Sequence, residues 1–345
     1  MNIREAIAQV IAGNNLSELQ MYEVMNIIMS GEATSAQIGS FITALRMKGE
    51  TVEEITGAVR VMRQKATRID TGVNTENGGI VVDTCGTGGD GSGTFNVSTA
   101  SAFVVAGAGV VVAKHGNRSV SSKCGSADVL EAAGVNLSLQ PEDICRCIKE
   151  VGIGFLFAPA LHGAMKYAIG PRKEIGVRTI FNILGPLTNP AGANVQVMGV
   201  FSRELTEPLA EVLGRLGSKR ALVVHGEGNL DELTVTGKTQ VTELKDGKTS
   251  TYHISPEAVG LSKCDISELQ GGDTAKESAS QLSAVLEGET GPKRDMVLLN
   301  SGAALMASGC CDDFSSGVRL AGTIIDSGKA ISKLTELVKL SSQLK

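Results

Sequence analysis

The sequence predicts an α/β protein with a small N-terminal helical domain and a larger α/β domain built on a mainly parallel central sheet. Two observations predict this fold class. The first 66 residues carry apolar side chains at helical spacing, and after a turn-rich segment short apolar runs alternate with amphipathic stretches. Strands that alternate with helices favour a parallel sheet covered on both faces. We place the helical domain at residues 1–68 and the α/β domain at residues 78–345 of this 345-residue chain.

The helical domain is predicted from its helix starts. Three capping boxes, in which a Ser or Thr is followed three residues later by Glu or Gln, are Ser17 with Gln20, Thr34 with Gln37 and Thr51 with Glu54. Apolar residues follow each of them at helical spacing. A later proline-bounded, helix-like segment at about 165–190 is expected to return to this domain. The expected role of the helical domain is packing or dimerisation.

The α/β domain is predicted from βα alternation. Strand-like runs are "GIVVD" (79–83), "GVVVAKH" (109–115), "GIGFLFA" (152–158), "NVQVMGVF" (194–201), "RALVVHG" (220–226) and "MVLLN" (296–300). Helical stretches between them include "SADVLEAAG" (126–134), "QPEDICRCIKEVG" (140–152) and "ELTEPLAEVLGRLG" (204–217). In such sheets, ligands bind at the carboxyl ends of the strands. The polar, glycine-rich clusters that follow these strands are therefore expected to converge on one site.

Composition excludes several classes of protein. The net charge of −5 and the 3% aromatic content do not favour nucleic-acid binding. None of the seven cysteines forms a C-x-x-C pair, which argues against a zinc site and for free thiols in a reducing compartment. The longest apolar run, residues 102–113, is too short to span a bilayer. We expect a soluble, cytoplasmic protein with no nucleic-acid or membrane partner.

The first of the clusters is the glycine loop "GTGGDG" (86–91), which directly follows a predicted strand. A dinucleotide site would need an acidic residue about 20 positions further on, and a P-loop would need a following Gly-Lys-Ser/Thr. Neither is present. Backbone N–H groups at the start of the following helix favour phosphate binding. Asp90 would repel phosphate and is expected to accept from sugar hydroxyls, while the alternative is a tight turn capped by Asp90.

The second cluster is "KHGNRSVSSKCGS" (114–126), at the end of the next strand. Several cations among hydroxyl groups and an amide form an anion cradle. A solvated loop is the alternative, although it does not account for this density of polar groups after a buried strand. Two cradles indicate a ligand with phosphate at both ends.

Four motifs, "CGTGGDGSGTFNVST", "KHGNRSVSS", "GSADVLEAAG" and "GVRTIFNILGPLTNP", closely resemble the anthranilate phosphoribosyltransferase family over nearly the full chain. The resemblance implies the nucleoside phosphorylase/phosphoribosyltransferase type of fold and a homodimer. It implies the substrates phosphoribosyl pyrophosphate and anthranilate, with Mg²⁺, in tryptophan biosynthesis. The sequence departs from the family pattern at Ser119, where Ala is frequent, and at Gly163, where Pro is frequent.

The resemblance also implies the residues of the site. The phosphoribosyl pyrophosphate site would comprise Gly86, Gly89, Asp90, Thr94, Asn96, Val97, Ser98, Thr99, Lys114, His115, Gly116, Asn117, Arg118, Ser119, Val120, Ser121, Ser122 and Ser126. Gly86, Asn117 and Arg172 would contact anthranilate, and Ser98, Asp231 and Glu232 would hold the metal.

The residue types fit these two further roles. A benzoate-type acceptor needs a planar guanidinium for its carboxylate, which favours Arg172 over the neighbouring lysines Lys166 and Lys173. The adjacent carboxylates Asp231 and Glu232 are natural Mg²⁺ ligands. From the residues alone, a basic solvated helix face and an acidic solvated turn are the alternatives.

The expected reaction passes through a transition state with carbocation character at the ribose. Negative charge on the departing pyrophosphate would be stabilised by Mg²⁺, Lys114, Arg118 and aligned N–H groups. The aromatic amine is already neutral at pH 7, so no catalytic base is named. A pyrimidine nucleoside phosphorylase and a non-catalytic nucleic-acid-binding relative are the rival readings. The acidic pair and the "KHGN" run argue against the first, and a pI near 5.6 disfavours the second.

Overall fold

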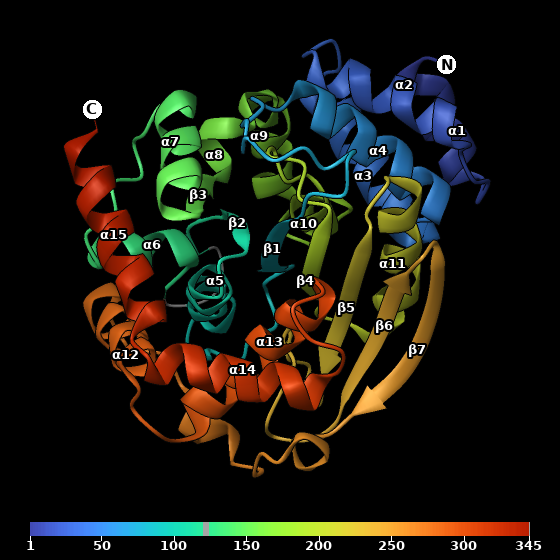
Figure 1. Cartoon of the computed structure of the whole chain (residues 1–345). Coiled ribbons are helices and arrows are strands. Elements are labelled where there is room, and N and C mark those ends of the chain that lie inside the picture. Colours follow the sequence, from blue (N-terminus) through green and yellow to red (C-terminus); the bar gives the residue numbers. More distant parts are fainter. Residues whose placement is uncertain (120–123, 345) are drawn as a thin grey trace.

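The computed structural model describes residues 1–119 and 124–344, and its centre is one seven-stranded sheet (Figure 1). The strand order is β3-β2-β1-β4-β5-β6-β7. The strands are β1 (Val81–Gly86), β2 (Val111–Gly116), β3 (Ile153–Phe157), β4 (Val195–Gly199), β5 (Arg220–Gly226), β6 (Thr239–Lys245) and β7 (Lys248–Ile254). Strands β1 to β5 pair in parallel, and β6 and β7 add an antiparallel hairpin at one edge. The predicted fold class, a helical domain plus an α/β domain with a mainly parallel sheet, is confirmed.

The helices are assigned as follows. The N-terminal ones are α1 (Ile3–Ile11), α2 (Glu18–Met29), α3 (Ser35–Lys48) and α4 (Val52–Lys65). The others are α5 (Val97–Gly107), α6 (Ser126–Ala132), α7 (Pro141–Val151), α8 (Ala158–Leu161), α9 (Lys166–Ile175), α10 (Phe181–Leu187), α11 (Thr206–Arg215), α12 (Ala275–Glu287), α13 (Pro292–Ala307), α14 (Phe314–Asp326) and α15 (Lys329–Gln343).

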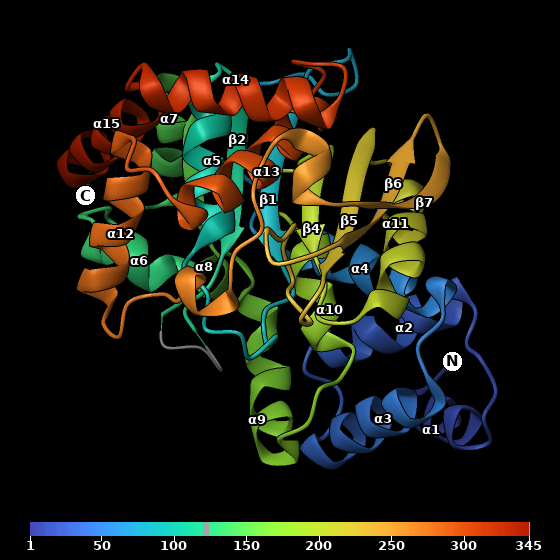
Figure 2. The ribbon, with the colours of Figure 1, turned by 90° about the horizontal axis from the view of Figure 1, so that it is seen from below.

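Alternation along the central strands divides the core between two faces of the sheet. On β5, Leu222 and Val224 belong to the core beneath α5 and α12–α15, whereas Ala221 and Val223 belong to the core shared with α1–α4 and α11. This is the period of two expected of a strand buried on both faces. Figure 2 shows α1–α3 and α9 on one side of the molecule and α14 and α15 on the other.

The three predicted capping boxes are confirmed at the starts of α2, α3 and α4, where side chain and backbone satisfy each other in both directions. A fourth box, Asn2 with Glu5, begins α1. In the later segment, α9 contacts α2 and α3, and its membership of the helical domain stays a prediction. The division of the chain at residues 68 and 78 stays a prediction.

In the C-terminal half, one predicted strand is wrong and one hairpin was not predicted. The run "MVLLN", expected as a strand, lies inside α13, where Met296 to Ala307 are all buried. A helix buried on every side has no polar face, so a short apolar run from it cannot be distinguished from a strand. The β6–β7 hairpin was not expected, although Asp246-Gly247, both at positive φ, is a strong hairpin-turn signal. Within the described residues, no helix is long and apolar enough to cross a membrane.

Candidate functional site

The predicted clusters follow strands that are neighbours in the sheet. β1 lies between β2 and β4, so the chain order reverses at β1, and such a switch point is where open α/β sheets bind ligands. The glycine loop follows β1, the second cluster follows β2, and the acidic pair follows β5. Because these strands are parallel, all three segments lie at the carboxyl ends of the strands, on the same side of the sheet.

The glycine loop uses its glycines for two different purposes. Gly88, Gly89, Gly91 and Gly93 have φ angles of +66°, +73°, +73° and +66°, a region that L side chains rarely adopt. Gly86 has no such φ and is needed for close approach instead. A Cβ added there would lie 2.4 Å from the Asp231 Oδ2 atom.

The acidic segment lies directly over the ends of the strands. A Cβ added to Gly199, the last residue of β4, would lie 1.5 Å from the Asp231 carbonyl oxygen. One added to Gly226, the last residue of β5, would lie 2.7 Å from the Glu232 carbonyl oxygen. Only glycines at these strand ends let residues 231 and 232 pack there, so the sheet itself brings the acidic pair to the glycine loop.

Three carboxylates come together in this position. The Gly88 amide donates to Asp231 Oδ2 at 2.7 Å. Burial, and next the charge of Asp90, raise the pKa of Asp231. Burial and the charge of Asp231 raise the pKa of Glu232 well above its ordinary value, opposed by the nearby Lys114 ammonium and by an amide hydrogen bond from Ser98. Half-buried like charges with pKa values raised in this way mark a candidate functional site.

The acidic pair fits a hydrated divalent cation. Carboxylates that repel each other in a buried position would be stabilised by a positive ion, and Mg²⁺ commonly uses one or two carboxylates and keeps several waters. Among the described residues, no three His, Cys, Asp or Glu side chains form a ready-made metal cage. Glu227, the third acidic residue of the loop, instead accepts from the Lys238 amide at 3.0 Å.

Lys114 and the start of α5 supply the positive side of the site. The Lys114 ammonium is buried on β2 and donates to the Thr84 carbonyl at 2.7 Å and to Ser98 Oγ at 3.4 Å. Thr99 Oγ1 is buried with no hydrogen-bond partner among the described residues. A charged amine and an unsatisfied hydroxyl beside a helix N-terminus are suited to binding a phosphate group.

The remaining predicted donor residues occupy the two loops or flank them. Asp90 accepts from the Ser92 amide and hydroxyl at 3.0 and 2.7 Å, and Ser92 Oγ lies 3.1 Å from Thr94 Oγ1. Asn96 donates to the Cys124 carbonyl at 3.2 Å, and Val97 is buried as the first residue of α5. Gly116 ends β2.

Beyond β2, the Asn117 carbonyl accepts from Ser126 Oγ at 3.3 Å. The Ser119 amide donates to Asp128 at 3.1 Å. Val120, Ser121 and Ser122 lie outside the described residues.

Arg118 has a different environment from Lys114. Its guanidinium donates to Asp128 at 2.8 Å and to both Glu131 oxygens at 2.8 and 3.0 Å. Its charge is therefore balanced by two carboxylates of α6. To contact a pyrophosphate, Arg118 would have to exchange these partners.

A buried histidine pair adjoins the site, and sequence reasoning had identified only one member. The Nε2 atoms of His115 and His162 lie 3.2 Å apart, so one donates and the other accepts. Burial lowers the pKa of His115 to about 3 and that of His162 to about 4. Both rings are neutral near pH 7. The single signal for His162 was a lone histidine just before the basic 166–178 segment.

The predicted acceptor residue Arg172 lies on α9. Its guanidinium carbon is 5.1 Å from the centre of the Phe181 ring, and burial lowers the pKa of Arg172. Among the described residues, no carboxylate forms an ion pair with it. Gly163 begins a short 3₁₀ turn with open space around it, so the departure from proline leaves a regular backbone.

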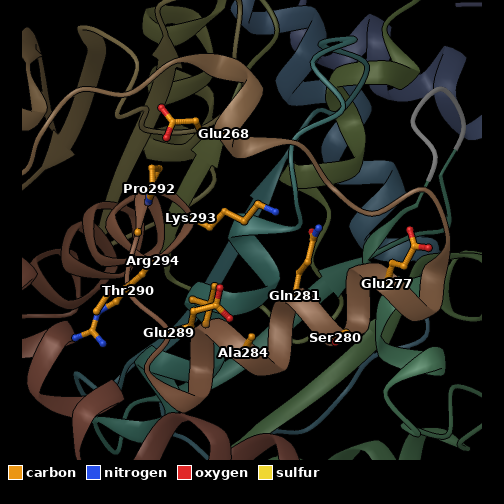
Figure 3. A pocket seen from close by; sticks show the side chains of 12 residues that line it. Glu268, Glu277, Ser280, Gln281, Ala284, Glu289, Thr290, Pro292, Lys293 and Arg294 are labelled. Carbon is orange, nitrogen blue, oxygen red and sulfur yellow. The ribbon is translucent and has the colours of Figure 1, made fainter.

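A separate hollow of about 560 Å³ lies between α12 and the start of α13 (Figure 3). It is lined by residues such as Glu277, Gln281 and Lys293, whose side chains Figure 3 shows around the opening. None of the predicted site residues lines it. The glycine loop and the acidic pair lie at the strand ends and do not line this hollow.

Comparisons with known proteins identify the family of the chain. Residues 4–66 match the model of the glycosyl transferase family helical bundle domain, and residues 78–331 match that of its a/b domain. The chain is 61% identical over 338 residues to the anthranilate phosphoribosyltransferase of Desulfotalea psychrophila, covering 98% of this chain and 97% of that protein. It is 58% identical over 350 residues to that of Geotalea uraniireducens, covering 99% and 100%.

Solved structures are similar over the whole chain. The crystal structure of anthranilate phosphoribosyltransferase from Thermus thermophilus has a TM-score of 0.91 at 44% identity and covers 98% of this chain and 99% of that one. The enzyme from Saccharomyces cerevisiae in complex with PRPP (phosphoribosyl pyrophosphate) and Mg has a TM-score of 0.88 at 27% identity, covering 99% and 98%. The same yeast enzyme is also known in complex with 4-fluoroanthranilate.

Proposed function

The chain belongs to the anthranilate phosphoribosyltransferases of the glycosyl transferase family, and from this premise we propose how its residues divide the work. It transfers the phosphoribosyl group of phosphoribosyl pyrophosphate to the amino group of anthranilate. The products are N-(5-phosphoribosyl)anthranilate and pyrophosphate, in tryptophan biosynthesis. The enzyme uses Mg²⁺. The observation that carries the residue assignment is that Asp231 contacts the glycine loop while Glu232 lies near the Lys114 ammonium.

We assign the donor to the edge where β1, β2 and β5 end. Lys114, the Ser98 hydroxyl and the Thr99 hydroxyl would bind the phosphate groups, and Asp90 would accept from the ribose hydroxyls. Asp231 and Glu232, with Ser98, would hold Mg²⁺. When bound there, the metal neutralises charge that builds on the departing pyrophosphate. The Lys114 ammonium stabilises the same charge from a buried position, where electrostatic interactions are strong.

We assign the acceptor to the α9 side of the site. The Arg172 guanidinium is half-buried and has no carboxylate of its own among the described residues, so it would pair with the anthranilate carboxylate. Gly86 and Asn117 would border the acceptor ring. The acceptor amine attacks as the neutral base, and these residues supply its orientation.

We further propose that the protein acts as a homodimer in the cytoplasm. Support for a dimer comes from large apolar side chains on the outer surface of the helices, since Met47 is 84% exposed and Ile11 69% exposed. Burial of such side chains against a partner would be favourable.

One assay tests the function directly. Loss of anthranilate fluorescence should require the protein, phosphoribosyl pyrophosphate and Mg²⁺ together. A nucleoside phosphorylase would instead cleave a pyrimidine nucleoside with phosphate and need no metal.

Arg172→Ala should raise the KM for anthranilate by about 10- to 100-fold, because a charge-assisted bidentate pair is lost, and change the KM for the donor little. Steady-state kinetics with each substrate varied in turn checks this. An effect confined to phosphoribosyl pyrophosphate would refute the assignment of Arg172.

A further inference from the structure

Arg178 joins the acceptor side of the site to the donor loop. It lies between α9 and α10, six positions after Arg172, and Gly176 at φ +67° ends α9 just before it. Its side chain leaves this segment and its NH2 group donates to the Gly89 carbonyl in the middle of the glycine loop. The guanidinium carbon also lies 4.3 Å from the centre of the Phe201 ring.

The partners of Arg178 are themselves linked. Phe201 follows β4, and its amide donates to Thr87 Oγ1 at 3.1 Å. The Thr87 amide in turn donates to the Gly199 carbonyl at 2.9 Å. Arg178 thus completes a ring of contacts through the segment after α9, the glycine loop and the loop after β4.

The chemistry of Arg178 suits a positioning role. A planar guanidinium can stack on an aromatic ring and donate from its edge at the same time, which an ammonium cannot do. Gly89 is at φ +73°, and a Cβ added there would lie 3.7 Å from the Arg178 NH2 group, so the arginine lies close against this left-handed turn. Among the described residues, no carboxylate forms an ion pair with Arg178.

We propose that Arg178 is a positioning residue that fixes the Gly89–Asp90 part of the donor loop relative to the segment carrying Arg172. This inference rests on the proposed assignment of donor and acceptor to these two segments. If Arg178 has this role, its loss impairs the use of both substrates, although Arg178 is not among the residues that we assign to the metal or the phosphate groups. Misplacement of a bound substrate by about 1 Å can cost on the order of 100-fold in rate.

The test compares Arg178→Met, Arg178→Lys and the control Lys173→Met, an exposed lysine of α9, in steady-state kinetics with each substrate varied. We expect Arg178→Met to lower kcat/KM for both substrates by about 10- to 100-fold. Arg178→Lys keeps the charge and should recover only a small part of this loss. Lys173→Met should stay within about twofold of the unchanged enzyme, as surface substitutions usually do.

A double-mutant cycle with Phe201→Leu separates a positioning role from a general loss of structure, because only a positioning role predicts that the two losses of activity are not additive. If Arg178 acts through its stacked position, the Arg178→Met, Phe201→Leu double variant should be no worse than Arg178→Met alone. Fully additive losses, wild-type kinetics for Arg178→Met, or full activity of Arg178→Lys would each overturn the proposal. An unchanged enzyme that does not consume anthranilate would instead refute the proposed function, so the two failures are distinguishable.

Discussion

The helical domain and the strand-end site both withdraw carboxylates from solvent, Glu54 fully and Asp231 partly, but in opposite ways. Glu54, at the start of α4, is fully buried and accepts from the Lys48 ammonium and the amides of Leu16 and Thr51 at 2.8–2.9 Å. Asp231 is held by the Gly88 amide and faces the carboxylate of Asp90. The first carboxylate is neutralised by its own fold, whereas the second is left for a ligand to neutralise.

The first arrangement contributes to the stability of the fold, whereas the second serves the activity. A buried, satisfied ion pair is costly to break but does no chemistry. Buried carboxylates that repel each other lower the stability of the chain until a cation binds, and perturbed groups of this kind gather at functional sites. Substitutions in the two regions should therefore separate activity from stability.

The largest effect is expected at the acidic pair. Asp231→Asn with Glu232→Gln should reduce turnover by about 10⁴-fold or more, because charge on the departing pyrophosphate loses its metal. Without Mg²⁺, the thermal unfolding midpoint should stay the same or rise, since the repulsion is removed. Turnover assays and thermal melts check this. Activity close to that of the unchanged enzyme at saturating Mg²⁺ would contradict the metal assignment.

The opposite result is expected for the buried pair of the helical domain. Glu54→Ala leaves the Lys48 ammonium buried and unpaired, which should lower the free energy of unfolding by about 3–5 kcal/mol. The folded fraction should keep its kcat. The matched control is Glu53→Ala, whose exposed pair with Arg215 should contribute less than about 1 kcal/mol. Equal losses of stability for the two variants in urea unfolding would show that the Glu54 pair has no special weight.

A smaller loss of activity is expected where β4 ends. Gly199→Ala places a methyl group against the Asp231 backbone, which has to shift, so turnover should fall by about 100-fold. Gly170→Ala on α9 meets nothing within 4 Å and is the control that should retain activity. A fully active Gly199→Ala enzyme would indicate that the position of the acidic segment is not critical.

The smallest effect is on the pH dependence of stability. The pKa of His115 is lowered to about 3 by burial, with His162 and Lys114 acting in the same direction and the Gly185 backbone opposing, and that of His162 is lowered to about 4. As the pH falls below about 6.5, the unfolded chain therefore takes up two protons that the folded chain does not. Burial raises the pKa of Asp83 to about 6, so the folded state takes up one proton and opposes this.

These three groups together lower the stability by about 2 kcal/mol between pH 7 and pH 5, whereas the raised pKa values of Asp231 and Glu232 act in the same direction as that of Asp83 and offset this loss. His162→Gln removes one of the two histidines and should therefore raise the stability at pH 5 relative to that at pH 7, compared with the unchanged enzyme. Urea unfolding at a series of pH values measures it. A slope unchanged by His162→Gln would show that the buried histidines do not control acid stability.

The two regions also differ in how far the sequence predicts them. The capping boxes at Ser17, Thr34 and Thr51 are local signals, and the helices begin where they indicate. Nothing local indicates that Asp231 lies over Gly199, because that contact depends on the order of the strands. The family resemblance supplied the role of the acidic pair before the geometry explained it.

Other misses have the same cause. His162 and Arg178 act through residues 47 and 89 positions away in the chain, and no spacing rule joins them. The strand predicted at 296–300 is wrong for a different reason, because a helix that is buried on all sides shows no apolar–polar period. Local chemistry thus predicts the scaffold, while close packing between distant segments completes the site.

The ends of β1, β2, β4 and β5 would together bind the metal and the donor in one pocket. A crystal structure of the protein with phosphoribosyl pyrophosphate and Mg²⁺ tests it most directly. We expect the metal on Asp231 and Glu232 and the pyrophosphate in contact with Lys114. Donor density away from the glycine loop, with no metal on the acidic pair, would contradict it.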